Sequence, residues 1–234
     1  MIGALAALLG TVPPGASSAD YEQAAVDGNV LGKQTEGARR RTFRYLRELY
    51  LLRPDALLFR ALRDLWSDDR EARPLLAGLC ALARDAVFRA SSDAITRSHP
   101  GDRLTAKDLA EVVGERFAGV YSDSTLAKIG RNVFSSWEQT GHLASRARLE
   151  KLRTRPTCHA ANVAYALMLG HLEGARGQAL FTTLWAGALD QPASHLVDLA
   201  VSASQRGLIE FRSAGGVVEV GFRQLLRPFD EMHA

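Results

Sequence analysis

The sequence predicts a mainly α-helical protein: a helical bundle with winged-helix units, each a helix-turn-helix followed by a small β-hairpin. Apolar residues recur at helical spacing through most of the 234 residues, and short breaks rich in Pro, Gly or Ser separate these segments. Convincing strand patterns occur only in roughly the last forty residues. We expect a helical domain with a basic helix over 1–100, a helix-turn-helix unit with a basic flank over 101–155, and a winged-helix-like unit over 156–234.

The composition is that of an ordinary globular protein. Hydrophobic residues make up 47% of the chain and charged residues 24%, which excludes disordered, collagen-like and coiled-coil classes. The two cysteines, Cys80 and Cys158, lie far apart and form no C-x-x-C pair. A disulfide scaffold or a cysteine zinc site is therefore not expected, and a reducing compartment fits best.

No segment has the features of a targeting or membrane-spanning sequence. The apolar run Met1–Gly10 follows no Lys or Arg, and it is too short to span a bilayer. No other run approaches the roughly 18 apolar residues that a transmembrane helix needs. We therefore expect a cytoplasmic protein with no membrane partner.

The positive charge is concentrated in two islands. The formal net charge is +3, yet residues 36–53 hold six arginines against two glutamates, and residues 122–155 hold seven basic residues against three acidic ones. Each island carries +4, so the remaining chain carries −5. Basic islands on an acidic body are typical of a phosphate-backbone footprint, although a solvated helix face gives the same pattern.

The first island lies on a predicted helix that begins near Thr35. On a helical wheel, Phe43, Leu46 and Tyr50 share one face. A second stripe, about a quarter-turn away, consists of Arg40, Arg44 and Arg47. This stripe is a candidate contact to DNA phosphates, but Glu48 stands four residues after Arg44 and can pair with it.

Two leucine-rich helices follow, over Asp55–Ser67 and Glu71–Ala90. Their Leu, Ala and Phe content predicts core helices, in which Cys80 is a small apolar filler. We assign no chemistry to them.

The segment 104–143 predicts a helix-turn-helix. Thr105 is a good N-cap for a helix that runs through Phe117. A break over 119–124 precedes a second helix, which starts at Ser124 or Thr125 and is ended by Gly141.

The second of these helices has one apolar and one polar face. The apolar face consists of Leu126, Ile129, Val133 and Trp137, and the opposite face of Lys128, Arg131, Asn132 and Ser135. Arg and Asn can pair bidentately with guanine and adenine edges, so this helix is a candidate for entry into a DNA major groove. Two-helix hairpins also occur in purely structural bundles.

Basic residues continue directly after this helix, where a wing or a backbone-clamping segment is expected. We predict that Arg146, Arg148 and Lys151 flank the groove-facing helix and contact DNA phosphates.

The C-terminal unit repeats the order helix, turn, helix, hairpin. We expect one helix over Ala179–Leu189, with Leu180, Leu184 and Trp185 facing inward, and a second that Ser194 caps and Gly207 ends. Alternating residues over 208–211 and 217–222 flank the turn 213–216, which predicts a hairpin. The second helix carries Asp198 and little positive charge, so we favour a structural or protein-binding role over DNA contact.

The sequence offers no recognisable catalytic or metal motif. The stretch Gly28–Thr35 resembles a phosphate-binding loop but is one residue short between its glycines and follows no strand. Cys158, His159 and His171 lack a fourth ligand with sensible spacing. We therefore predict no catalytic residue, no metal site and no cofactor, and we expect that the protein is not an enzyme.

Several strings along the chain resemble one family. Leu31-Gly-Lys33-Gln-Thr35 leads into Arg39-Arg40-Arg41 and Leu46-Arg47-Glu-Leu49, two leucine-rich helices follow, and Lys128-Ile129 then precedes Gly141-His-Leu143. Over roughly residues 30–143 this order is similar to that of the BrxA family of bacterial BREX phage-defence systems. The resemblance implies a small, mostly helical, winged-helix-containing protein that binds DNA without a known catalytic activity. The region after Pro156 departs from the family pattern.

These observations predict a non-catalytic component of a phage-defence system that binds double-stranded DNA chiefly through phosphates. The main alternative is an adaptor that docks a larger defence enzyme through its apolar and C-terminal surfaces. A winged-helix transcriptional regulator is a further alternative, and it would lose discrimination when Arg131 or Asn132 is changed. Other defence-system proteins are possible partners, and the sequence leaves the oligomeric state open.

Overall fold

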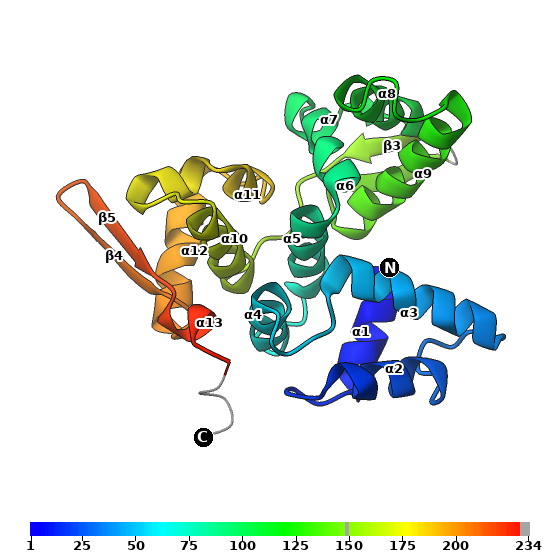
Figure 1. The fold of residues 1–234 in the computed structure, drawn as a ribbon. Helices are drawn as coiled ribbons and strands as arrows, with labels where there is room; N and C mark the ends of the chain where they lie inside the picture. The colour runs from blue at the N-terminus through cyan, green and yellow to red at the C-terminus, as the bar shows by residue number, and fades with distance from the viewer. Residues whose placement is uncertain (148–149, 230–234) are drawn as a thin grey trace.

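The computed structural model describes residues 1–147 and 150–229. It is mainly helical with two small antiparallel sheets, which confirms the predicted mainly α class. Figure 1 shows the N-terminal helices at the lower right, a compact unit with the three-stranded sheet above them, and the C-terminal helices and hairpin on the left. No described helix has the length and apolar character that crossing a membrane requires.

The N-terminal helices follow their local signals. They are α1 (Ile2–Thr11), α2 (Ser18–Val26), α3 (Glu36–Tyr50), α4 (Leu57–Trp66) and α5 (Arg73–Arg84). Thr35 caps α3 by accepting a hydrogen bond from the Ala38 amide, and Phe43, Leu46 and Tyr50 are buried as the wheel predicts. The predicted helix over 71–90 is instead two helices. Asp85 is extended, and its carboxylate caps α6 (Ala86–Ala90) by accepting from the amides of Val87 and Phe88.

The central unit surrounds a sheet that sequence analysis did not assign. Its elements are α7 (Ser92–Arg97), β1 (Arg103–Leu104), α8 (Ala106–Arg116), α9 (Asp123–Gln139), β2 (Leu143–Ala147) and β3 (Glu150–Arg153). The strands pair antiparallel in the order β1-β3-β2. They are short and rich in polar residues, so the sequence carries no strand period there. Thr105 caps α8 as predicted, while Ser122, rather than a later residue, caps α9.

The C-terminal unit contains α10 (Ala160–Leu172), a 3₁₀-helix η1 (Gly177–Thr182), α11 (Leu184–Gly187), α12 (Ala193–Gln205), β4 (Glu210–Ala214), β5 (Val217–Gly221) and α13 (Arg223–Leu226). The predicted hairpin is confirmed, and Gly215 and Gly216 both take positive φ in its turn. The predicted single helix over 179–189 is wrong. Thr183 is extended between η1 and α11, so the helical phase restarts and Leu184 is 43% exposed instead of buried. The predicted Ser194 cap is also wrong, because α12 begins at Ala193 after Pro192 without a side-chain cap.

One continuous hydrophobic core runs through all three regions, from Leu5 to Leu225. Nearly every residue of α10 is buried, because this helix packs between α12 on one side and α4 and α5 on the other. Two polar side chains of α10 fix that packing: the Asn162 amide donates to the Ala72 carbonyl at 2.8 Å, and the Tyr165 hydroxyl donates to the Leu58 carbonyl at 2.9 Å. Removing either member of such a buried hydrogen-bonded pair lowers the free energy of unfolding, because the other group is left without a partner.

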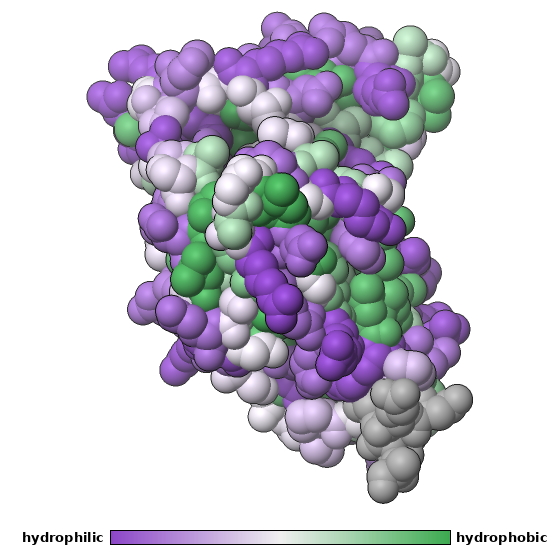
Figure 2. Space-filling model, turned by 90° about the vertical axis from the view of Figure 1, so that its left-hand side faces the viewer, coloured by the Kyte–Doolittle hydropathy of each residue, from purple (hydrophilic) through white to green (hydrophobic). Residues whose placement is uncertain are grey.

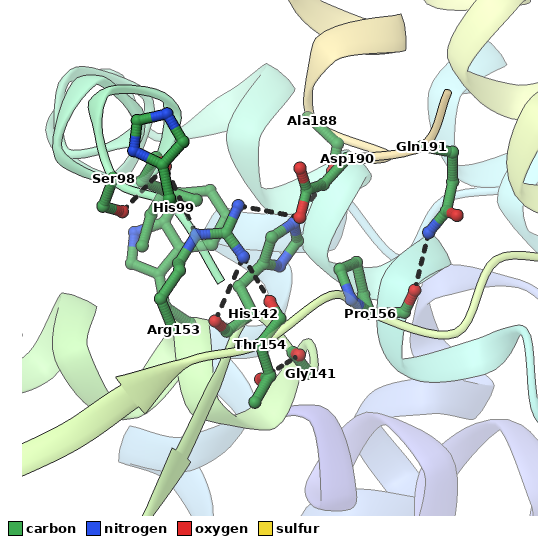
Figure 3. Close-up of polar contacts among 12 residues, drawn as sticks. Ser98, His99, Gly141, His142, Arg153, Thr154, Pro156, Ala188, Asp190 and Gln191 are labelled. Atoms are coloured by element: carbon green, nitrogen blue, oxygen red, sulfur yellow. Dashed lines mark hydrogen bonds and ion pairs between the residues drawn. The ribbon is translucent and has the colours of Figure 1, made fainter. Parts of the chain in front are cut away.

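A buried polar junction joins the central unit to the C-terminal unit (Figure 3). The guanidinium of Arg153 is 3% exposed and donates to the carbonyls of Ile95, His142 and Thr154. Its second terminal nitrogen lies 2.9 Å from the carboxylate of Asp190. A buried arginine needs such a set of acceptors, because an unpaired buried charge is strongly destabilising.

His142 occupies the same junction as a neutral imidazole. Its Nε2 lies 2.9 Å from the carbonyl of Ala188, which can only accept, so Nε2 carries the proton. Nδ1 lies 2.8 Å from the Thr140 hydroxyl oxygen, which also lies 3.0 Å from the Trp137 carbonyl. Burial, and secondarily the charge of Arg153, lower the pKa of His142 to about 3.

This burial predicts an acid-sensitive fold. The unfolded chain binds a proton at His142 near pH 6.5, whereas the folded protein does not, so the free energy of unfolding falls as pH falls below about 6.5. Between pH 6.5 and 5, wild type should lose up to about 1.4 kcal/mol per pH unit from this group. Urea titrations of His142→Gln should show a shallower pH dependence over that window. Parallel pH dependences in the two proteins would contradict the assignment of a buried neutral imidazole.

Candidate nucleic-acid interface

The solvent-facing side of α9 carries the residues that sequence analysis assigned to the DNA groove. Lys128, Arg131, Asn132 and Ser135 are all exposed, and we call them the α9 face. Val133 and Trp137, on the opposite side, are buried, and Leu126 and Ile129 are half-buried. In the described parts of the chain, no ion pair engages Lys128 or Arg131. These two cations are therefore available to an anionic partner.

A glycine sets how closely α9 packs on α8. A Cβ at Gly130 would lie 2.2 Å from the Ala106 carbonyl oxygen and 2.8 Å from the Ala110 side chain. The backbones of α8 and α9 are therefore in close contact at Gly130, with no side chain between them. This contact places the N-terminal half of α9, with Lys128 and Arg131, on the outside of the central unit.

The β2–β3 hairpin is fastened to the other end of α9. The Lys151 ammonium donates to the Glu138 carboxylate at 2.8 Å and to the Phe134 carbonyl at 3.3 Å. Ser145 of β2 donates to the same carboxylate. Hydrogen bonds from Lys151 and Ser145 hold the pKa of Glu138 below its usual range.

This geometry corrects the prediction for Lys151. Its side chain is buried and satisfied within the protein, and Arg153, two residues on, points to the same side of β3 and is also buried. Strand residues two apart share a face, and the prediction of a wing or backbone-clamping segment without a strand register could not separate inward from outward cations. Arg146 is exposed on β2, and Arg148 lies outside the described residues.

The arginine stripe of α3 is exposed, but two of its three members pair within the helix. Arg40 lies 2.7 Å from Glu36, and Arg44 lies 3.8 Å from Glu48. Exposed ion pairs of this kind contribute little to stability, so the glutamates compete only weakly with a phosphate for these arginines. For Arg47, the described residues provide no ion-pair partner.

Helices α3 and α9 both line one cleft. It has a volume of about 510 Å³, and its walls include Tyr45 and Glu48 of α3 and Asn132 and Ser135 of α9. The two charge islands, far apart in sequence, therefore border the same hollow. Sequence analysis missed Tyr45. The signal that could have identified it is an aromatic residue within the arginine-rich stretch 39–47.

His159 lies beside an acidic side chain. Its Nδ1 is 2.8 Å from an Asp69 carboxylate oxygen. Within residues 1–147 and 150–229, no three His, Cys, Asp or Glu side chains are grouped to hold a metal ion. Cys80 is buried and Cys158 is half-buried, and both are free thiols.

Comparisons with known proteins find solved structures of similar fold, but they find no matching family. No family model and no curated protein matches the sequence. Solved structures of similar fold include one described as the SspB crystal structure, at 14% identity and a TM-score of 0.59, and one described as magnesium ion-bound SspB, at 13% and 0.60. Each match covers 95% of this chain and 80% of the SspB chain. At these identities the likeness shows a shared fold alone.

The close α8–α9 contact gives a test of how the α9 face is positioned. Gly130→Ala should destabilise the protein by about 1–3 kcal/mol, because the added methyl must displace the Ala106 backbone. Gly37→Ala in α3 is the matched control, since a Cβ there meets nothing within 4 Å. The control should be neutral or stabilising by up to about 1 kcal/mol. Equal effects in chemical denaturation would contradict the packing described.

Proposed function

We propose that the protein is a non-catalytic, double-stranded-DNA-binding component of a phage-defence system, and that it binds chiefly through phosphate contacts. The observation that carries the proposal is the α9 face. It places two cations without ion-pair partners in the described structure beside an exposed amide and a hydroxyl, next to the hairpin that carries Arg146.

The order of elements supports a winged helix. Helix α7, strand β1, helices α8 and α9, and the β2–β3 hairpin follow one another, with β1 completing a three-stranded sheet. In proteins of this type the second helix of the helix-turn-helix enters the major groove and the adjoining segments contact the backbone. By this proposal α9 is that helix, and the hairpin is the wing.

Phosphate contact accounts for the residues better than base readout alone. Lys128, Arg131 and Arg146 are exposed cations, and contacts from such cations to DNA phosphates do not depend on the base sequence. Arg47 is a further exposed cation on α3, the helix whose Tyr45 and Glu48 line the cleft. Asn132 is the residue of the α9 face best suited to reading a base, because its amide can pair with adenine.

The defence context rests on two independent likenesses. The order of residues over roughly 30–143 resembles the BrxA family of phage-defence proteins. The solved structures of similar fold carry the name SspB, which supports a phage-defence context.

An adaptor function is the second candidate, and apolar exposure in the C-terminal unit favours it. Figure 2, which views the molecule from the side of that unit, shows hydrophobic patches between polar residues. Within residues 156–229, four large apolar side chains are at least 40% exposed: Leu172, Leu184, Val201 and Val217. In this function the basic surfaces would meet an acidic partner protein.

Binding of an unrelated DNA duplex, followed by fluorescence anisotropy across a salt series, tests the proposal. Wild type should bind at low salt, and log K should fall linearly with log salt concentration. Lys128→Glu/Arg131→Glu should bind at least tenfold more weakly and lose about two units of salt slope, one for each phosphate contact removed.

A second charge reversal provides the control. Arg212→Glu/Arg223→Glu changes the net charge by the same amount on the C-terminal hairpin and α13, and should leave both affinity and slope near wild type. Absence of binding at low salt, or equal losses in both variants, would overturn the α9 interface. Co-purification of a protein partner that survives the Lys128 and Arg131 reversal would then support the adaptor.

A further inference from the structure

We propose that the cleft between α3 and α9 receives a single unpaired nucleobase of the DNA that is bound on the α9 face. The inference rests on the proposed function and goes beyond it by assigning a site for one base. Asn132 and Ser135 belong both to the α9 face and to the cleft wall, so the two surfaces are continuous.

The interior of the cleft suits a neutral heterocycle better than a phosphate. Apolar side chains of Leu49, Phe88 and Val133 line it, and none of its described lining residues is Lys or Arg. Glu48 and Asp85 add carboxylates, which repel phosphate but accept hydrogen bonds from the amino groups of bases. The side-chain cations stand outside the lining: Arg44 adjoins Tyr45 on α3, and Lys128 precedes Asn132 by one turn of α9. The terminal ammonium of Met1, which does line the cleft, is engaged within the protein, because it donates to the Gln139 side-chain oxygen at 3.0 Å.

Tyr45 provides a surface on which a base can stack. It is an exposed large aromatic side chain, 43% accessible, and it lines the cleft. The Arg44 guanidinium lies over its ring at 5.2 Å from the centroid. Aromatic rings next to arginines are the usual platform for single bases, because every base has a π-face.

Asn132 provides a free hydrogen-bonding group at the same place. The neighbouring Gln139 amide is already engaged: it donates to Ser135 and accepts from the Ile2 amide. The described structure gives the Asn132 side chain no hydrogen-bond partner. Its amide therefore offers one donor edge and one acceptor to a base edge.

An intact duplex resists extrusion of a base, whereas a mismatched or unpaired base is already available. The cleft should therefore favour DNA with an extrahelical base over fully paired DNA of the same sequence. A duplex with one bulged 2-aminopurine is a suitable probe, since its fluorescence reports stacking of that base.

Wild type should bind the bulged duplex about tenfold more tightly than the paired duplex, with a change in 2-aminopurine fluorescence. Tyr45→Ala should lose both the preference and the fluorescence change, yet bind the paired duplex as wild type does. Tyr45→Phe keeps the ring and should retain both properties. Thermal melts followed by circular dichroism check that the variants are folded.

Three results separate this inference from the proposed function. Equal affinity of wild type for the two duplexes overturns the base site and leaves phosphate binding intact. A bulge preference that persists in Tyr45→Ala also overturns the assignment to this cleft. Failure to bind either duplex overturns the proposed function and the base site together.

Discussion

The buried guanidinium of Arg153 holds the central unit in one arrangement. It binds the carbonyl of Ile95 in α7, the carbonyl of His142 and the carboxylate of Asp190 from the C-terminal unit. Removing one partner of such a buried pair typically costs about 3–5 kcal/mol, because the remaining charge stays buried without compensation. Since Arg153 is the last residue of β3, its side chain links the end of the hairpin to both His142 and the C-terminal unit.

The same buried contacts determine which basic side chains of the central unit stay on the surface. Lys151 and Arg153 alternate with outward residues on β3 and fasten the hairpin from within, through Glu138 of α9 and through Asp190. The cations of the α9 face, Arg146 and the α3 stripe are among those that remain exposed. The chain thus uses one part of its basic island to assemble the unit and leaves the other part exposed. In our account the exposed part meets DNA.

Sequence reasoning succeeded where the signals are local. Thr35 and Thr105 cap their helices as predicted, Gly215 and Gly216 form the hairpin turn, and the faces of α3 and α9 follow the helical period. It failed where the outcome depends on distant contacts. The three-stranded sheet exists because β1 and β2 pair with β3, although none of the strands has a strand-like pattern alone. The burial of Lys151 and the cleft beside Tyr45 likewise depend on residues far away in the chain.

The central claim is that α9 and its hairpin meet DNA, whereas α12 and its hairpin do not. An amide-resolved NMR titration of the full chain with a short duplex tests this most directly. The account predicts that chemical-shift changes concentrate on residues 124–135 and 144–146, and that the amides of α12, β4 and β5 stay in place. Changes confined to α12 and the β4–β5 hairpin, with α9 unaffected, would contradict it.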